Sequence, residues 1–192
     1  MHATHDPSKK SGSPAEPLLK PLASFYEAAG HSLPPVRFID GDAMPQPYRS
    51  LLVHDTDMTS TLEKFHSATI RIRALASRRN DMDYEREVLL VTRDAEKIVE
   101  FGAIHIALGK FPDEARDEVL REETPLGAIL LAHRIAFRSA PRGFFEIDSN
   151  ELISAALALP LPQTLYGRCN VLLDAHGGAL AEIVEILPPA KK

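Results

Sequence analysis

The stretch YEREVLLVTRDAEKIVEFGAIHIAL, residues 84–108, decides the fold class. Its first part, residues 84–93, is rich in Val and Leu, and its last part, residues 98–108, places Ile104, Ile106 and Leu108 on one side, so both predict strands. Four residues, 94–97, separate the two strands. A parallel pair would need a crossover of about a dozen residues, so these strands pair antiparallel as a hairpin.

The same patterns extend outward in both directions. Alternation predicts strands at 68–76 and at 135–148, the latter interrupted at 139–143, and a second hairpin at 165–173 and 179–187. Helices are expected at 18–29, after Asp57, at 112–121, at 126–133 and after Ser149. The proline-bearing segment 31–50 predicts an ordered crossing loop. Clustered strands with helices between the clusters indicate one α+β domain at 18–189 with an antiparallel sheet, preceded by a disordered arm at 1–17.

Composition narrows the class of function. The 192 residues carry a net charge of −5, which argues against nucleic acid as a partner because phosphate binding needs a basic face. No apolar run approaches the ~20 residues of a membrane span, and residues 1–17 lack the apolar core of a signal peptide, so a cytoplasmic protein is expected. The single cysteine, Cys169, is expected to serve packing. The eight histidines have no metal-ligand spacing, and no nucleotide-cofactor motif is present, so neither metal nor cofactor is expected.

Three charged residues stand inside apolar strands. Arg86 lies within 84–91, and Glu182 and Glu185 lie within 180–187. A sheet with one solvated face would leave all three in water. Alternatively, a buried arginine needs an anion, and a planar carboxylate is its best geometric match. Glu182 and Glu185 are three residues apart and point to opposite faces of a regular strand, so without a bulge only one of them can face a cavity.

Five short segments, in order and with fitting spacing over residues 45–189, resemble chorismate pyruvate-lyase. They are Asp55-Thr56-Asp57-Met58-Thr59, Arg86-Glu87-Val88-Leu89-Leu90, Thr124-Pro125-Leu126-Gly127, Tyr166-Gly167-Arg168 and the glutamate-bearing strand before Pro188. The resemblance is closest to the broad chorismate lyase-like branch.

The resemblance implies a six-stranded antiparallel sheet with helices packed on one side and a buried ligand cavity. It implies an enzyme that eliminates pyruvate from chorismate or a related acid to give 4-hydroxybenzoate, without metal or organic cofactor. By position, Arg86 would bind the ring carboxylate, Met58 and Leu126 would close over the ring, and Arg168 would join the substrate-binding set. A glutamate of the last strand would bind the 4-oxygen and act as the catalytic acid.

The sequence departs from the family at the other end of the substrate. Counted back from Pro188 without gaps, the family glutamate falls on Val184. Glu182 keeps the parity of that position and Glu185 does not, so Glu182 is favoured as the catalytic acid and Glu185 is its rival. A second family arginine falls on Ala103, with Glu100 and His105 nearby, and Cys169 stands where an arginine is common.

Two further functions stay open. The same fold serves as the effector-binding domain of a class of bacterial transcription regulators, so the chain could bind a small aromatic acid without catalysis. The first 45 residues show no helix-turn-helix pattern and little basic charge, which argues against a complete repressor. Alternatively, the chain is an interaction protein with a vestigial cavity. The expected partner is therefore a small aromatic or chorismate-like carboxylic acid, and neither nucleic acid nor membrane.

Overall fold

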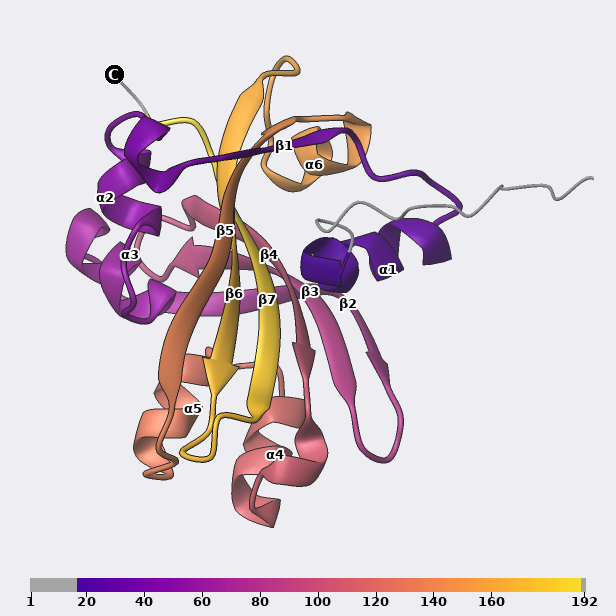
Figure 1. The fold of residues 1–192 in the computed structure, drawn as a ribbon, viewed down its shortest axis with the longest axis vertical. Helices are drawn as coiled ribbons and strands as arrows, with labels where there is room; N and C mark the ends of the chain where they lie inside the picture. Colours follow the sequence, from indigo (N-terminus) through magenta and orange to yellow (C-terminus); the bar gives the residue numbers. More distant parts are fainter. Residues whose placement is uncertain (1–16, 191–192) are drawn as a thin grey trace, which may run out of the picture.

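The computed structural model describes residues 17–190, and within them seven strands form one antiparallel sheet in the order β1-β5-β6-β7-β4-β3-β2 (Figure 1). The strands are β1 (Val36–Ile39), β2 (Ile70–Arg79), β3 (Tyr84–Thr92), β4 (Ile98–Ile106), β5 (Arg138–Asp148), β6 (Thr164–Leu173) and β7 (Ala179–Leu187). The helices are α1 (Lys20–Ala28), α2 (Tyr48–Leu52), α3 (Met58–His66), α4 (Asp113–Leu120), α5 (Leu126–Ala132) and α6 (Glu151–Ala156), with 3-10 turns η1 (Pro17–Leu19), η2 (Gly41–Ala43) and η3 (Leu108–Lys110). The α+β class and both predicted hairpins are confirmed.

The expected count of six strands is wrong, because β1 adds a seventh. This strand lies in the segment predicted as a crossing loop and pairs with β5 at one edge of the sheet, with Phe38 opposite Phe145. It is four residues long, follows two prolines and shows no buried alternation, so its sequence has no strand pattern. The predicted interruption at 139–143 is a register shift between Pro141 and Gly143, and β5 continues through it.

The expectation that helices pack on one side of the sheet is also wrong. On one face, α1 and α6 pack through Leu22, Phe25 and Ile153 against buried strand residues that include Leu89 and Val184. On the other face, α2 and α3 form one apolar cluster with the sheet, and α4 and α5 form another. The centre of the sheet is therefore buried on both faces, which explains why residues 88–91 of β3 form a continuous apolar run rather than an alternating one.

The two helix pairs on the second face leave a space between them. Figure 1 shows α2 and α3 beside one end of the sheet and α4 and α5 at the other. The Asp57 side chain accepts a hydrogen bond from the Ser60 backbone N–H at 2.9 Å and so begins α3, whereas Pro125 precedes the first residue of α5. The first residues of both helices, Met58 and Leu126, line one cavity together with residues of the sheet.

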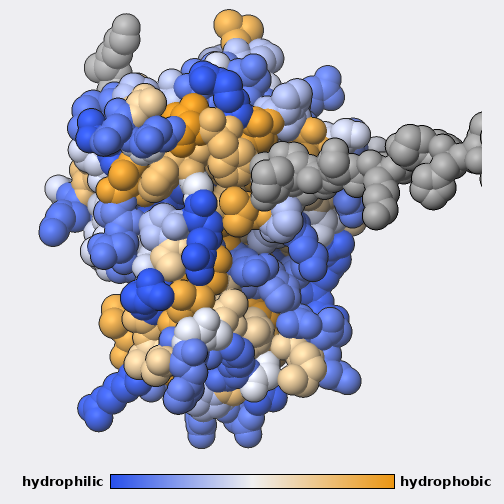
Figure 2. Space-filling view, viewed as in Figure 1, coloured by the Kyte–Doolittle hydropathy of each residue, from blue (hydrophilic) through white to orange (hydrophobic). Residues whose placement is uncertain are grey.

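The surface in the same view alternates hydrophilic and hydrophobic areas (Figure 2). The exposed large apolar side chains of the described residues stand on different elements: Phe65, Leu75, Met82, Leu131, Leu152 and Leu161. Scattered exposure of this kind is ordinary for a folded domain. No helix within residues 17–190 has the length and apolar content needed to cross a membrane. The arm expected at residues 1–17 lies outside the described residues, apart from Pro17, which begins η1.

Candidate functional site

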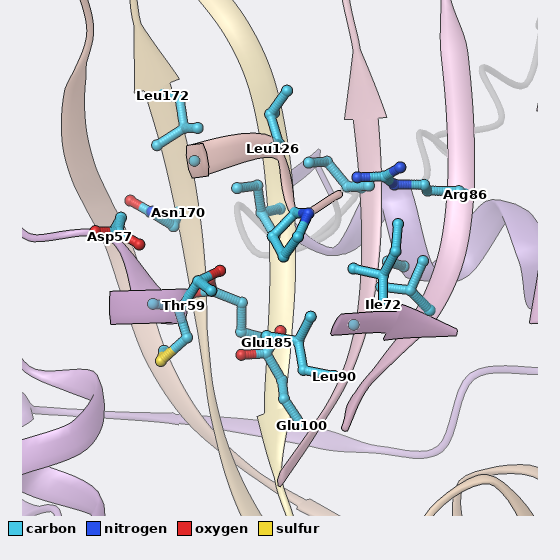
Figure 3. Close-up of a pocket in the computed structure, with 18 residues that line it drawn as sticks. Asp57, Thr59, Ile72, Arg86, Leu90, Glu100, Leu126, Asn170, Leu172 and Glu185 are labelled. Carbon is cyan, nitrogen blue, oxygen red and sulfur yellow. The ribbon is translucent and has the colours of Figure 1, made fainter. Parts of the chain in front are cut away.

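A cavity of about 70 Å³, which is space for several water molecules, lies between the sheet and the first turns of α3 and α5 (Figure 3). Most of its wall is apolar. The polar side chains of the wall are Asp57, Thr59, Arg86, Glu100, Asn170 and Glu185.

Strand register brings these side chains together. Leu90 pairs with Glu100 and Arg86 pairs with Ile104 across β3 and β4, while Gly102 pairs with Glu185 across β4 and β7. Directly paired residues of antiparallel strands point to the same face, so alternate positions of β3, β4 and β7 line one wall. The positions between them, such as Leu89, Phe101 and Val184, belong to the apolar cluster with α1 on the opposite face.

Arg86 is a buried cation without an anionic partner. Its side chain is 2% exposed, its Nη1 donates to the Val119 carbonyl oxygen at 3.4 Å, and its Nε has no hydrogen-bond partner among the described residues. No carboxylate of residues 17–190 lies within ion-pair distance of it. Glu122, whose charge favours the protonated guanidinium, accepts instead from the Tyr84 hydroxyl. Burial lowers the pKa of Arg86, so the free site holds a costly charge that an anion would stabilise.

The opposite part of the cavity is acidic. Glu185 is buried and accepts a hydrogen bond from the Nε of Arg168, which is itself fully buried. The Nη1 of Arg168 donates to the carbonyl oxygens of Leu52 and His54 at 3.2 and 3.1 Å. Arg168 therefore joins the segment after α2 to the sheet, and it stands behind Glu185 rather than in the cavity wall.

Glu100 is the second carboxyl of this acidic part. It is 4% exposed, and its Oε2 has no hydrogen-bond partner within residues 17–190. Burial, reinforced by the charge of Glu185 and opposed by Arg168, raises the pKa of Glu100 well above 4.5. Glu100 therefore keeps its proton under mildly acidic conditions in which an exposed glutamate is ionised.

Met58 and Leu126 close the cavity from the helix side. Both are buried, at the first positions of α3 and α5. The two helix starts also approach each other, because a Cβ added at Gly127 would lie 3.3 Å from the Asp57 Oδ1. A ligand in this cavity would be enclosed between two helix termini and the sheet.

The structure brings together Arg86, Met58, Leu126 and Glu185, four of the residues singled out in the sequence, in one cavity wall. Their roles remain predictions. Arg168 contacts the site through Glu185.

The choice of Glu182 over Glu185 as the cavity-facing glutamate is wrong. Glu182 is half-buried on the other face, paired in register with His105. No register shift interrupts β7 between Ala181 and Ile186 in its pairing with β4, so Ile183 and Glu185 share the cavity face. The error came from counting back from Pro188 without gaps, which placed the expected position one residue too early.

Sequence reasoning noted Glu100 only as a neighbour and did not name Asp57, Thr59 or Asn170 for the site. The sequence feature that points to Glu100 is its place within the apolar segment 98–104.

Other polar residues have structural roles. His105 pairs with Asp83 at 3.2 Å. Cys169 is buried in the core, where burial raises its pKa to about 12. Among the described residues, no group of three His, Cys, Asp or Glu side chains could hold a metal ion.

Comparison with known proteins reveals a similarity of fold. No family model and no curated protein sequence matches the chain. The structure is similar to that of PhnF from Mycobacterium smegmatis, with a TM-score of 0.54 and 14% identity over 69% of this chain and 63% of that chain. It is also similar to the effector domain of PhnF, with a TM-score of 0.55 and 14% identity over 68% of this chain and 87% of that domain.

A third similar structure is the ligand-binding domain of a protein from Bordetella bronchiseptica described as a GntR-family transcriptional regulator. Its TM-score is 0.50, with 9% identity over 62% of this chain and 85% of that chain. The chain therefore has the fold of regulator effector domains, and it spans less than two thirds of the full PhnF chain.

Proposed function

We propose that this protein binds a small carboxylic acid with an apolar, flat middle, and that the acid's carboxylate pairs with Arg86. One observation carries the proposal: the Arg86 guanidinium lines the cavity, is 2% exposed, and has no carboxylate partner among residues 17–190. An unpaired buried charge is destabilising, so a site of this kind is built for an anion that arrives with the ligand. A carboxylate matches the planar guanidinium fork and accepts two parallel hydrogen bonds.

The wall beyond Arg86 favours an aromatic or similarly flat body. Ile72, Val88 and Leu90 of the sheet lie on one side of the cavity, and Met58 and Leu126 lie on the helix side. Apolar walls with a few convergent polar groups are typical of small-molecule sites. The similar structures support a binding role, since two of them are an effector domain and a ligand-binding domain.

The test is calorimetric titration of the full chain with benzoate and with 4-hydroxybenzoate. We expect Arg86→Met to weaken binding by on the order of 10- to 100-fold, because a hydrogen bond to a charged group contributes about 1.5–3 kcal/mol. The control is Arg73→Met, which removes an exposed arginine of β2 and leaves the affinity unchanged. Equal affinity of wild type and Arg86→Met would remove Arg86 from the site.

A second function, elimination of pyruvate from a chorismate-like acid, is favoured by Glu100. This reaction breaks an ether C–O bond, takes one proton off the ring and aromatises it, so the protein must orient the substrate and move protons. A protonated Glu100 beside Glu185 could donate to the departing oxygen, with the ring carboxylate on Arg86.

The number of cationic side chains in the cavity favours binding of a simple acid over this reaction. Chorismate carries two carboxylates, whereas Arg86 is the one Lys or Arg in the cavity wall formed by the described residues, and Ala103 stands where the resembled family has another arginine. Incubation with chorismate and chromatography for 4-hydroxybenzoate tests the reaction. Product formed by the wild type and lost in Arg86→Met would establish it, and binding of 4-hydroxybenzoate without product would leave the binding role alone.

A further inference from the structure

The cavity has two unsatisfied ends of opposite character, and a simple acid would satisfy one of them. At one end the Arg86 Nε is a donor without a hydrogen-bond partner among the described residues. At the other end Glu100 and Glu185 stand in the wall, and the Glu100 Oε2 has no hydrogen-bond partner within residues 17–190. Arg168, which neutralises Glu185, is not part of the wall, so a ligand would meet the carboxyl groups rather than the guanidinium. Asp57 adds a third carboxylate to the same cavity.

Strand register fixes the separation of the two ends. Arg86 is opposite Ile104, and Glu100 is four residues from Ile104 along β4, a rise of about 13 Å between the two levels of the sheet. Arg86 and Glu100 both line the cavity, and Glu185, which pairs with Gly102, stands at a level between them. Val88, which pairs with Gly102, lines the wall between the two levels, and Figure 3 shows Arg86 well apart from Glu100 and Glu185. One molecule with a short apolar middle can therefore contact both ends.

Building on the proposed binding of a carboxylic acid at Arg86, we propose that the ligand is a zwitterion whose basic nitrogen is held between Glu100 and Glu185. An ammonium group offers three N–H donors, enough for both carboxyl groups, whereas a hydroxyl group offers one. It also balances charge, since two carboxylates would then face the Arg168 guanidinium and the ligand's ammonium. The ligand class is an aromatic acid that carries an aminoalkyl group.

Binding of an ammonium group beside Glu100 should release a proton from the protein. The charged groups that face Glu100 are Glu185 from β7 and Arg168 from β6, with Asp57 of the α3 N-terminus and Arg86 of β3 further around the cavity. In the free protein burial and Glu185 outweigh Arg168 and raise the pKa of Glu100, so this carboxyl keeps its proton to a higher pH than an exposed glutamate does. An ammonium ion next to Glu100 reverses this balance, so its binding displaces the proton into solvent.

The test compares benzoate, 4-hydroxybenzoate and 4-(aminomethyl)benzoate on the full chain by calorimetry, each in two buffers of different ionisation enthalpy. We expect 4-(aminomethyl)benzoate to bind at least about tenfold more tightly than benzoate and to release about one proton, with no release for benzoate. Glu100→Gln should remove the preference and the proton release. Glu182→Gln is the matched control, because its side chain lies on the other face of the sheet, and it should keep both.

The experiment distinguishes failure of the zwitterion proposal from failure of the proposed function. Should 4-hydroxybenzoate bind as tightly as the ammonium ligand, or should Glu100→Gln keep the preference, the zwitterion proposal is overturned while Arg86-dependent binding of acids stands. Should none of the three acids bind, or should they bind equally to Arg86→Met, the proposed function itself fails.

Discussion

Glu185 lies directly opposite Arg168 in the register of β6 and β7, and the two form a buried ion pair between the Arg168 Nε and the Glu185 Oε2. The guanidinium is fully buried and the carboxylate is 5% exposed. Arg168 also donates to the Leu52 and His54 carbonyl oxygens, so this one pair connects the segment before α3 to the sheet. Position 185 therefore supports the cavity as well as lining it.

Removal of one partner should show that dual role. We expect Glu185→Leu to lower the free energy of unfolding by about 3–5 kcal/mol, because it leaves the Arg168 charge buried and unpaired. The double variant Arg168→Met with Glu185→Leu should be less destabilised than Glu185→Leu alone, since no buried charge is left without a partner. Urea denaturation measures both, with Glu182→Leu on the opposite face as a control expected to change stability by less. Equal losses in the single and double variants would contradict the assignment.

Replacement of Arg86 should stabilise the ligand-free protein while it weakens ligand binding. We expect Arg86→Met to raise the melting temperature of the ligand-free protein, with a gain on the order of 1 kcal/mol, because an apolar chain of similar length replaces an unpaired buried charge. The same variant should lose the rise in melting temperature that benzoate gives the wild type. A thermal-shift assay measures both, and Arg73→Met controls for the loss of a charge. A lower melting temperature for ligand-free Arg86→Met would mean that its bond to the Val119 carbonyl outweighs the burial of its charge.

The sequence was sufficient for the two hairpins, because tight turns and apolar strand segments are local properties of residues 84–108 and 165–187. It was insufficient for β1, whose strand conformation depends on pairing with β5, over 100 residues away in the chain. Packing of helices on both faces could have been inferred from the apolar run 88–91, since strands buried on both faces lose their alternation.

The candidate site was predictable in part for a similar reason. Parity showed that Glu182 and Glu185 point to opposite faces, but the cavity face is set by the pairing of Gly102 with Glu185, which is a long-range contact. Glu100 was not recognised as a site residue because a single acid in an apolar strand is also typical of a solvated face. Its burial depends on the helices that cover this face, and no local pattern reports that.

Gly167, within the resembled segment Tyr166-Gly167-Arg168, permits a close approach of strands. A Cβ there would lie 2.4 Å from the Phe145 Cζ and 2.5 Å from the Glu185 backbone oxygen, which are both below any contact distance. The backbone oxygen cannot move without disturbing the pairing of Gly167 with Ile186. We therefore expect Gly167→Ala to cost about 1–3 kcal/mol or more in urea denaturation.

Gly102→Ala is the matched control for this prediction. Its added Cβ would meet the Glu100 Oε1 at 3.1 Å and the Val184 carbonyl oxygen at 3.3 Å, contacts that small shifts can relieve. The loss of stability should be smaller than for Gly167→Ala. The opposite order would contradict the packing described here for β6 against β7.

The proton on Glu100 should make stability depend on pH. The pKa of Glu100 in the folded protein lies well above 4.5, whereas its pKa in the unfolded chain is close to 4.5. Above about pH 4.5 the folded state therefore binds more protons at this position than the unfolded state does. The stabilisation is complete below pH 4.5 and is lost as the pH rises toward the folded pKa, with a slope of up to about 1.4 kcal/mol per pH unit.

Glu100→Gln isolates this contribution, because glutamine does not titrate and all other groups are shared. We expect the difference in unfolding free energy, variant minus wild type, to increase steadily from pH 4.5 upward in urea denaturation of the ligand-free proteins. Titration of His54, whose pKa burial lowers, cancels in this difference. Parallel pH profiles would mean that Glu100 is ionised in the folded protein. Arg168 would then neutralise both glutamates, and the acidic end of the cavity would have no proton for an ammonium ligand to displace.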